Sequence, residues 1–211
     1  MLCLHLKKSI PQFMKKYFFT FLVSCILLFD TYAQDNMPQL PYYEIPEYPS
    51  EYTAQTTAAR MIDGLGFRYY WATEGLTEKD LEYRPDDMAR TSGETIDHIL
   101  GLSTVIVNCT KKLPNGGGGQ EKLSFEEKRK QTLENLKQAS DILKSSNADG
   151  LEDYILIFEG KESNTEFPFW NLINGPIADA IWHVGQVVSF RRSSGNPFNS
   201  KVSVMTGKVR E

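Results

Sequence analysis

Apolar residues recur every three or four positions between residues 53 and 76, and this period predicts a first long helix. The residues that carry the period are Ala54, Ala58, Met61, Ile62, Leu65 and Tyr69. Gly64 and Gly66 are weak points in this helix, because glycine lowers helix stability. Residues 76–87 (LTEKDLEYRPDD) contain Pro85, and we predict a loop there.

Two further helices begin at capping boxes, in which a Ser or Thr and a Glu three residues later satisfy free backbone N–H groups. The first box, Thr91 to Glu94, opens a helix predicted over Ser92–Lys111. The second box, Ser124 to Glu127, opens a helix with one apolar face. That face consists of Leu133, Leu136, Ala139 and Leu143. The intervening PNGGGGQEK is predicted to be a flexible connection.

The last predicted helix has signals at both ends. Asn-Gly-Pro at residues 174–176 places its proline at the first helical position, where the missing N–H costs nothing. Ser-Gly-Asn-Pro at residues 194–197 predicts the C-terminal end, roughly 18 residues further on. Arg191 and Arg192 are expected to leave the helix near that end.

Four long helices without a convincing series of strands predict an all-α fold, an up-and-down four-helix bundle. We assign residues 53–211 to this domain, with the tail, residues 196–211, running back along it as a C-terminal strap. Residues 34–52 are rich in Pro and Tyr and are predicted to be an extended linker or a strap over the domain. Residues 151–169 are compatible with a short strand, a helical turn or a loop.

The N-terminus has the order of parts of a secretory signal peptide: a short basic region, an apolar run and a small-residue cleavage site. Residues 1–33 are therefore predicted to be a signal peptide, with Met14 as the true start. Cleavage after Ala33 predicts an exported protein, periplasmic or extracellular, with no membrane span in the mature chain. In the alternative interpretation, the lipobox-like residues 22–25 make the mature protein a lipoprotein anchored at Cys25.

Loss of the leader changes the cysteine and charge counts. Cys109 alone remains, so no intrachain disulfide is expected. The leader holds four of the 23 basic and one of the 27 acidic residues, which leaves 19 and 26 and a net charge of −7. An acidic chain is a poor partner for nucleic acids or anionic membranes, so we expect neither.

The last helix carries a carboxylate and an imidazole one turn apart, Asp179 and His183. Residues four apart share a helix face, and Gln186 lies on the same face. The surroundings are apolar, so a buried Asp179 would need a paired group or a cation. His98, on the second helix, is also expected to point inward. The residues alone leave open a surface ion pair, a buried hydrogen bond or metal ligands from two helices.

Three landmarks, in this order, resemble the DinB-like (DinB/YfiT-like) family of four-helix-bundle metal proteins. GLTEKDLEYRP at residues 75–85 is similar to the loop that follows the first helix of the family. SGETIDHILGL contains His98 where the family has a histidine in its second helix. His-Val-Gly-Gln at residues 183–186 resembles the family's signature in the last helix. The resemblance spans about residues 53–197.

The resemblance implies that His98, Asp179 and His183 bind one divalent metal ion. The family most often has histidine where this chain has Asp179, but a carboxylate oxygen is also a metal ligand. Two imidazoles and one carboxylate suit zinc, iron, nickel or manganese. The ligating atoms should lie within roughly 3 to 4.5 Å of one another, at the mouth of the bundle. Gln186 is expected either to hold a ligand or metal-bound water, or to make an ordinary hydrogen bond between helices.

Other residues near these landmarks have simpler interpretations. Trp170 and Trp182 are predicted to be aromatics of the core or its rim rather than platforms for a substrate, and Cys109 a small buried hydrophobic residue. Asp97 falls in the polar strip of its helix and is expected to be solvated.

Two classes of function remain open at this point. The resemblance implies metal-dependent transfer or hydrolysis of a small-molecule substrate, in which the metal activates a thiol cofactor or a water. Export disfavours the thiol, because small thiols are mainly cytoplasmic. The alternative is a non-catalytic exported bundle that acts as a binding or structural module, and a homodimer is compatible with either.

Overall fold

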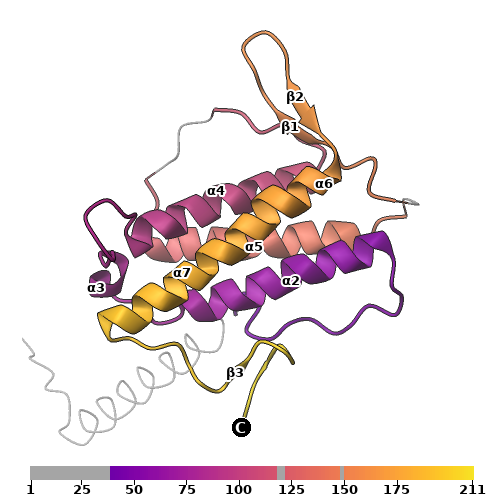
Figure 1. Ribbon diagram of the computed structural model, residues 1–211. Coiled ribbons are helices and arrows are strands. Elements are labelled where there is room, and N and C mark those ends of the chain that lie inside the picture. Colours follow the sequence, from indigo (N-terminus) through magenta and orange to yellow (C-terminus); the bar gives the residue numbers. More distant parts are fainter. Residues whose placement is uncertain (1–38, 118–121, 148–149) are drawn as a thin grey trace, which may run out of the picture. The chain divides into compact units, whose positions relative to one another are not determined.

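Long helices make up most of the described structure (Figure 1), so the prediction of an all-α domain is confirmed. The computed structural model describes residues 39–117, 122–147 and 150–211. The predicted leader, with Met14, Cys25 and the cleavage site at Ala33, lies outside the described residues. The four long helices are α2 (Ala54–Thr73), α4 (Ser92–Thr110), α5 (Phe125–Lys144) and α7 (Ala178–Ser194).

Both predicted capping boxes are present. The Thr91 side chain accepts a hydrogen bond from the Glu94 N–H (3.1 Å), and the Thr91 N–H donates to the Glu94 carboxylate (2.8 Å). Ser124 and Glu127 form the same reciprocal pair at the start of α5. Each cap stabilises its helix by about 1 kcal/mol and sets the residue at which it begins.

The prediction of a loop over residues 76–87 is wrong in part, because this segment contains the short helix α3 (Glu78–Leu81). The Asp80 carboxylate accepts hydrogen bonds from the backbone N–H and the hydroxyl of Thr77, both at 2.8 Å. This local pairing closes one helical turn ahead of Pro85.

The prediction that Pro176 occupies the first position of the last helix is wrong. Pro176 lies inside a longer helical rod. The rod consists of α6 (Phe169–Leu172), the π-helical turn η1 (Ile173–Ile177) and α7. Proline has no N–H and clashes with the carbonyl four residues earlier, and the wider turn accommodates it without ending the helix. The rod ends as predicted, at Gly195 (φ 99°), where the Asn196 N–H donates to the Arg191 carbonyl at 2.8 Å.

The π turn rotates everything that follows it. In a regular α-helix Asp179 and His183, seven and eleven residues after the buried Leu172, would lie within about 20° of it. Instead Ile177 and Val184 are buried, and Asp179 and His183 are only partly buried. The extra residue in the turn therefore moves both side chains from the core-facing line to the flank of α7.

The long helices pack in neighbouring pairs: α2 contacts α5 and α7, and α4 contacts the same two helices (Figure 1). Their facing sides form a single apolar core. The largest fully buried side chains are Tyr69, Phe67, Ile62, Leu65, Ile96, Ile99, Ile106, Leu133, Leu136, Leu143, Leu172 and Ile177. Among the described residues, no helix is long and apolar enough to cross a membrane.

The segment over residues 151–169 contains a strand, one of the three alternatives. β1 (Leu156–Phe158) pairs antiparallel with β2 (Thr165–Phe167), with Leu156 opposite Phe167. This hairpin extends away from the helices (Figure 1). In the C-terminal tail, β3 (Val202–Ser203) and β4 (Lys208–Val209) form a second hairpin, so the tail is not a simple extended strap.

The described part of residues 34–52 is a strap that packs against α2. Tyr42 is buried, and its hydroxyl donates to Asp63 at 3.1 Å. The Trp71 indole N–H donates to the Tyr43 carbonyl at 3.0 Å. A Cβ on Gly66 would lie 2.4 Å from the Tyr42 ring, so this glycine, a weak point by helix propensity, lets the strap approach the helix.

Candidate metal centre

His98, Asp179 and His183 form one cluster between α4 and α7. The Asp179 carboxylate bridges one nitrogen of each ring, with Oδ2 3.2 Å from His98 Nε2 and Oδ1 3.3 Å from His183 Nε2. The imidazole rings are 4.7 Å apart and nearly perpendicular. One ligand atom from each residue lies within 4.8 Å of the others, slightly beyond the expected upper limit.

The hydrogen bond from His183 to Gln186 decides which ring nitrogen of His183 carries a proton. In the present orientation of the Gln186 amide its oxygen lies 2.7 Å from Nδ1 and only accepts, so Nδ1 is the donor. In the neutral ring Nε2 then carries a lone pair, directed at Asp179 Oδ1. Two acceptors face each other across 3.3 Å, and a cation between them, a metal ion or a second ring proton, removes the repulsion.

The cluster is more exposed than its predicted inward position implied. The side chains of His98 and Asp179 are 35% and 40% exposed, and that of His183 is 15% exposed. The burial of Asp179 was thus overestimated, because the π turn rotates it toward the flank. The cluster also lies roughly two turns into α4 and near the middle of the α6–α7 rod, and not at a mouth of the bundle.

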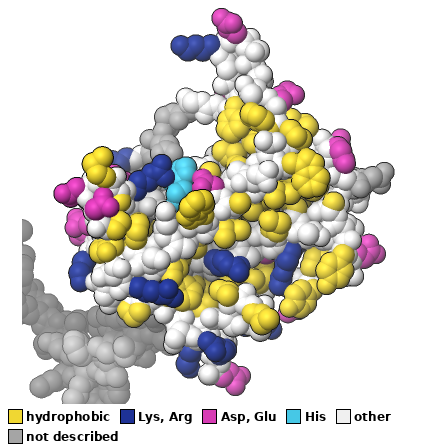
Figure 2. All heavy atoms as spheres, in the orientation of Figure 1, with side chains coloured by type: hydrophobic (Ala, Val, Ile, Leu, Met, Phe, Trp, Pro, Cys, Tyr) yellow, Lys and Arg dark blue, Asp and Glu magenta, His cyan; other side chains and the backbone are white. Residues whose placement is uncertain are grey.

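One open side of this cluster faces solvent. Figure 2 shows histidine surface bordered by acidic, basic and hydrophobic side chains. The donor set, two imidazole nitrogens and one carboxylate, fits a divalent transition metal that keeps a free coordination position.

Neighbouring residues follow their expected roles with one exception. Trp170 and Trp182 are both 72% exposed, so of the two predicted places the core is excluded and the rim remains. Asp97 is not simply solvated, because it forms an ion pair with Lys128 at 2.6 Å. Cys109 is buried as predicted, and burial raises the pKa of its thiol to about 12, so it offers no thiolate at neutral pH.

Sequence reasoning missed a second polar cluster, at the C-terminal end of α7, that includes Asp80 and Arg191. Arg191 does not leave the helix; its guanidinium is buried and donates to the carbonyls of Trp71 (2.9 Å) and Ala72 (3.0 Å). Two consecutive arginines at a helix end are both expected to be exposed when the sequence alone is considered. Only the packing of α7 on α2 distinguishes Arg191 from Arg192.

Comparison with known proteins finds no matching protein family, no similar curated protein and no similar solved structure. The resemblance to the DinB-like family therefore stays a prediction from the sequence landmarks.

Proposed function

We propose that this chain is an exported, DinB-like metal-binding protein in which His98, Asp179 and His183 hold one divalent cation. The site would belong to an up-and-down four-helix bundle formed by α2, α4, α5 and α7. The neighbouring pairs of long helices and the family landmarks support this fold. The leader-like sequence over residues 1–33 supports export.

One observation carries the metal proposal: a bare His183 nitrogen and a carboxylate oxygen of Asp179 face each other at 3.3 Å. His98 adds a third ligand from a separate helix, so the set is not a local helix contact. Zinc, nickel, iron or manganese would suit it, since each accepts imidazole nitrogen and carboxylate oxygen.

The open side of the cluster favours chemistry on a small molecule over a purely structural role. Structural zinc sites are closed by four protein ligands, whereas catalytic sites keep a position free. Three protein ligands and a solvent-facing side match the second pattern. A bound metal would supply Lewis acidity for a transfer or hydrolysis reaction, and Gln186 would keep His183 in the required tautomer.

Metal analysis of purified protein tests this proposal. The protein is stripped with a chelator, dialysed separately against Zn²⁺, Ni²⁺, Fe²⁺ and Mn²⁺, and assayed for bound metal. We expect one ion per chain for at least one of these metals. Asp179→Ala should lose it, whereas Asp179→His should retain it, because an imidazole replaces the lost carboxylate ligand.

Asp97→Ala is the matched control, because Asp97 adjoins His98 in sequence but pairs with Lys128. It should bind as much metal as the wild-type protein. A wild-type protein without stoichiometric metal, or equal binding by Asp179→Ala, would contradict the proposal and favour a His183 imidazolium paired with Asp179.

A further inference from the structure

An exposed indole borders the candidate metal centre. Trp182 lies three residues after Asp179 and directly before His183 on α7, and 72% of it is exposed. A tryptophan normally buries a large apolar surface, so this flat face is available to a ligand at the metal.

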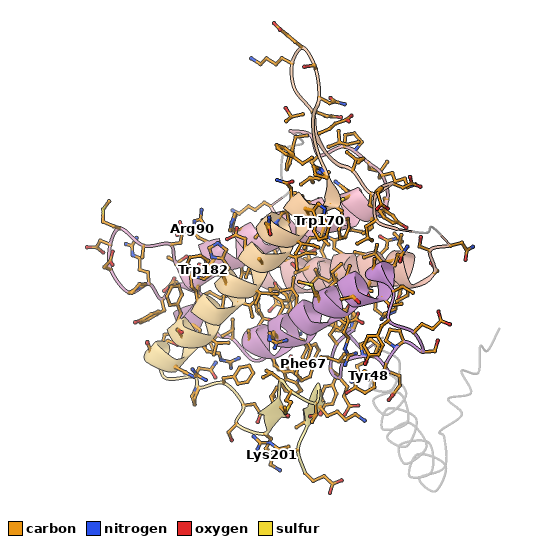
Figure 3. All side chains as sticks on the ribbon, turned by 45° about the vertical axis from the view of Figure 1, so that its right-hand side comes forward. Tyr48, Phe67, Arg90, Trp170, Trp182 and Lys201 are labelled. Atoms are coloured by element: carbon orange, nitrogen blue, oxygen red, sulfur yellow. The ribbon has the colours of Figure 1, made fainter. Side chains whose placement is uncertain are left out.

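An arginine lies near this indole in the view of Figure 3, which labels both Arg90 and Trp182. Figure 2 shows a basic and a hydrophobic side chain bordering the histidine surface. Arg90 directly precedes Thr91, the cap of α4, and is exposed. Within the described parts of the chain it makes no hydrogen bond or ion pair, whereas Arg84 pairs with Asp87 at 3.5 Å.

The balance of charge at this place favours an anion. A divalent ion held by Asp179 and two neutral imidazoles leaves one net positive charge, and Arg90 adds another. Of the carboxylates close to Arg90 and His98 in the sequence, Asp97 is balanced by Lys128, whereas Glu94 accepts only a backbone N–H and keeps its charge, so about one net positive charge remains. A ligand with a negative charge and a flat apolar part would therefore place its charge near the metal and Arg90 and its apolar part on Trp182.

We propose that the site binds a small organic carboxylate that carries a flat apolar group. Its carboxylate faces the metal and accepts hydrogen bonds from Arg90, and its apolar group packs on Trp182. This assignment rests on the proposed metal centre and specifies the class of substrate that the centre takes.

Titration of the Co²⁺-loaded protein tests the assignment, because the visible absorption of Co²⁺ changes when an anion enters its coordination sphere. Benzoate, acetate and neutral benzyl alcohol serve as probes. Benzoate should bind at least about tenfold more tightly than acetate, since it adds an aromatic contact to the shared carboxylate. Benzyl alcohol should give no response at the same concentrations.

Variants separate the two contacts. Arg90→Ala should weaken both carboxylates about tenfold, as expected for one charge-assisted hydrogen bond, and Arg90→Lys should restore part of the loss. Trp182→Ala should reduce the affinity for benzoate to that for acetate. Arg84→Ala and Trp170→Ala are matched controls, an exposed arginine in another ion pair and an equally exposed tryptophan, and should change neither affinity.

Equal affinities for benzoate and acetate, or an unchanged response in Arg90→Ala, would overturn the carboxylate site. A normal Co²⁺ spectrum with no response to any anion would overturn it while leaving the metal centre intact. Absence of a Co²⁺ spectrum would overturn both proposals, because no cation would then be present to attract the carboxylate.

Discussion

Two polar clusters share helix α7, and they differ in whether their hydrogen-bonding groups all find partners within the protein. The closed cluster (Asp80, Arg191, Ser194 and Asn196) lies at the C-terminal end of the helix. The open cluster (His98, Asp179 and His183) lies near its beginning. Both combine charged or ionisable groups from different helices.

In the closed cluster every charged group has matching partners. The Asp80 carboxylate accepts hydrogen bonds from Thr77, Ser194 and Asn196. Arg191 donates to four oxygens, two of them on Asn196, at 2.8 and 3.0 Å. Donors meet acceptors throughout, and both charged side chains are nearly inaccessible to solvent. Such a cluster ties α2, α3 and α7 together and leaves no place for a ligand.

In the open cluster one contact lacks a donor, although His98 Nε2 lies within hydrogen-bond distance of Asp179 Oδ2, at 3.2 Å. In the neutral His183 ring the single N–H donates to Gln186, so the nitrogen that faces Asp179 carries no proton. The cluster is also partly exposed. The two clusters therefore differ in their hydrogen-bond donors and in their exposure to solvent, and only the open cluster leaves a contact that a cation would satisfy.

The largest effect should come from breaking the closed cluster. Arg191→Ala leaves the carbonyls of Trp71 and Ala72 without a donor in a buried place and should lower the free energy of unfolding by about 3 kcal/mol. Urea denaturation followed by circular dichroism measures this change. In metal-free protein, Arg192→Ala, at the exposed neighbour, and His98→Ala should each change it by less than about 1 kcal/mol. Equal losses in all three variants would erase the contrast between the clusters.

Metal should stabilise the protein through the open cluster only. At a free concentration about 100 times its dissociation constant, a bound metal adds about 2.7 kcal/mol to the free energy of unfolding. We expect a chelator to remove this increment from the wild-type protein and from Arg192→Ala, and to have no effect on Asp179→Ala. Thermal unfolding with and without chelator is the measurement. A chelator effect that persists in Asp179→Ala would place the metal elsewhere.

Loss of the Gln186 acceptor should weaken metal binding without abolishing it. Gln186→Leu frees His183 to adopt the other tautomer or another ring orientation, and we expect the metal affinity to fall about tenfold. Gln186→Glu, which keeps an acceptor oxygen, should retain most of the affinity. Competition with a chromogenic chelator gives both constants. Unchanged affinity in Gln186→Leu would mean that this hydrogen bond only joins neighbouring turns of α7.

The smallest expected effect is the loss of folding stability at acid pH that comes from Asp80 in the closed cluster. Burial by itself would raise the pKa of Asp80, but hydrogen bonds from Asn196, Ser194 and Thr77 outweigh it and hold the pKa well below its usual range. The unfolded chain then binds the proton more readily, so this contribution is present above about pH 4 and is lost as the pH falls through the folded-state pKa.

The free energy of unfolding should therefore fall by on the order of 1 kcal/mol between pH 5 and pH 3 because of this residue. In Asp80→Asn the profile should be flatter over that range, with lower stability at neutral pH. Urea denaturation at each pH provides the profiles, and parallel profiles for the two proteins would show that Asp80 is not responsible.

Helix starts and ends were predictable because their signals act within a few residues. The capping boxes at Thr91 and Ser124 and the stop at Gly195 are all hydrogen-bonded as expected. Pro176 misled the prediction, since a proline allowed at a first helical position is also tolerated within a π turn. No local rule separates these cases, because the helix continues N-terminal to Pro176 only when Phe169 and Leu172 pack into the core.

The amino-acid sequence by itself determined the all-α character of the domain and the pairing of Asp179 with His183, since residues four apart share a helix face. The meeting of His98 with this pair was expected from the family landmarks and not from spacing, and tertiary structure alone decided that the pair lies on the flank of α7. It also decided that Arg191 is buried and Trp182 is not. The physical reason is that capping and spacing act over one turn, whereas the face a helix presents depends on the phase accumulated along the rod and on the helices packed against it.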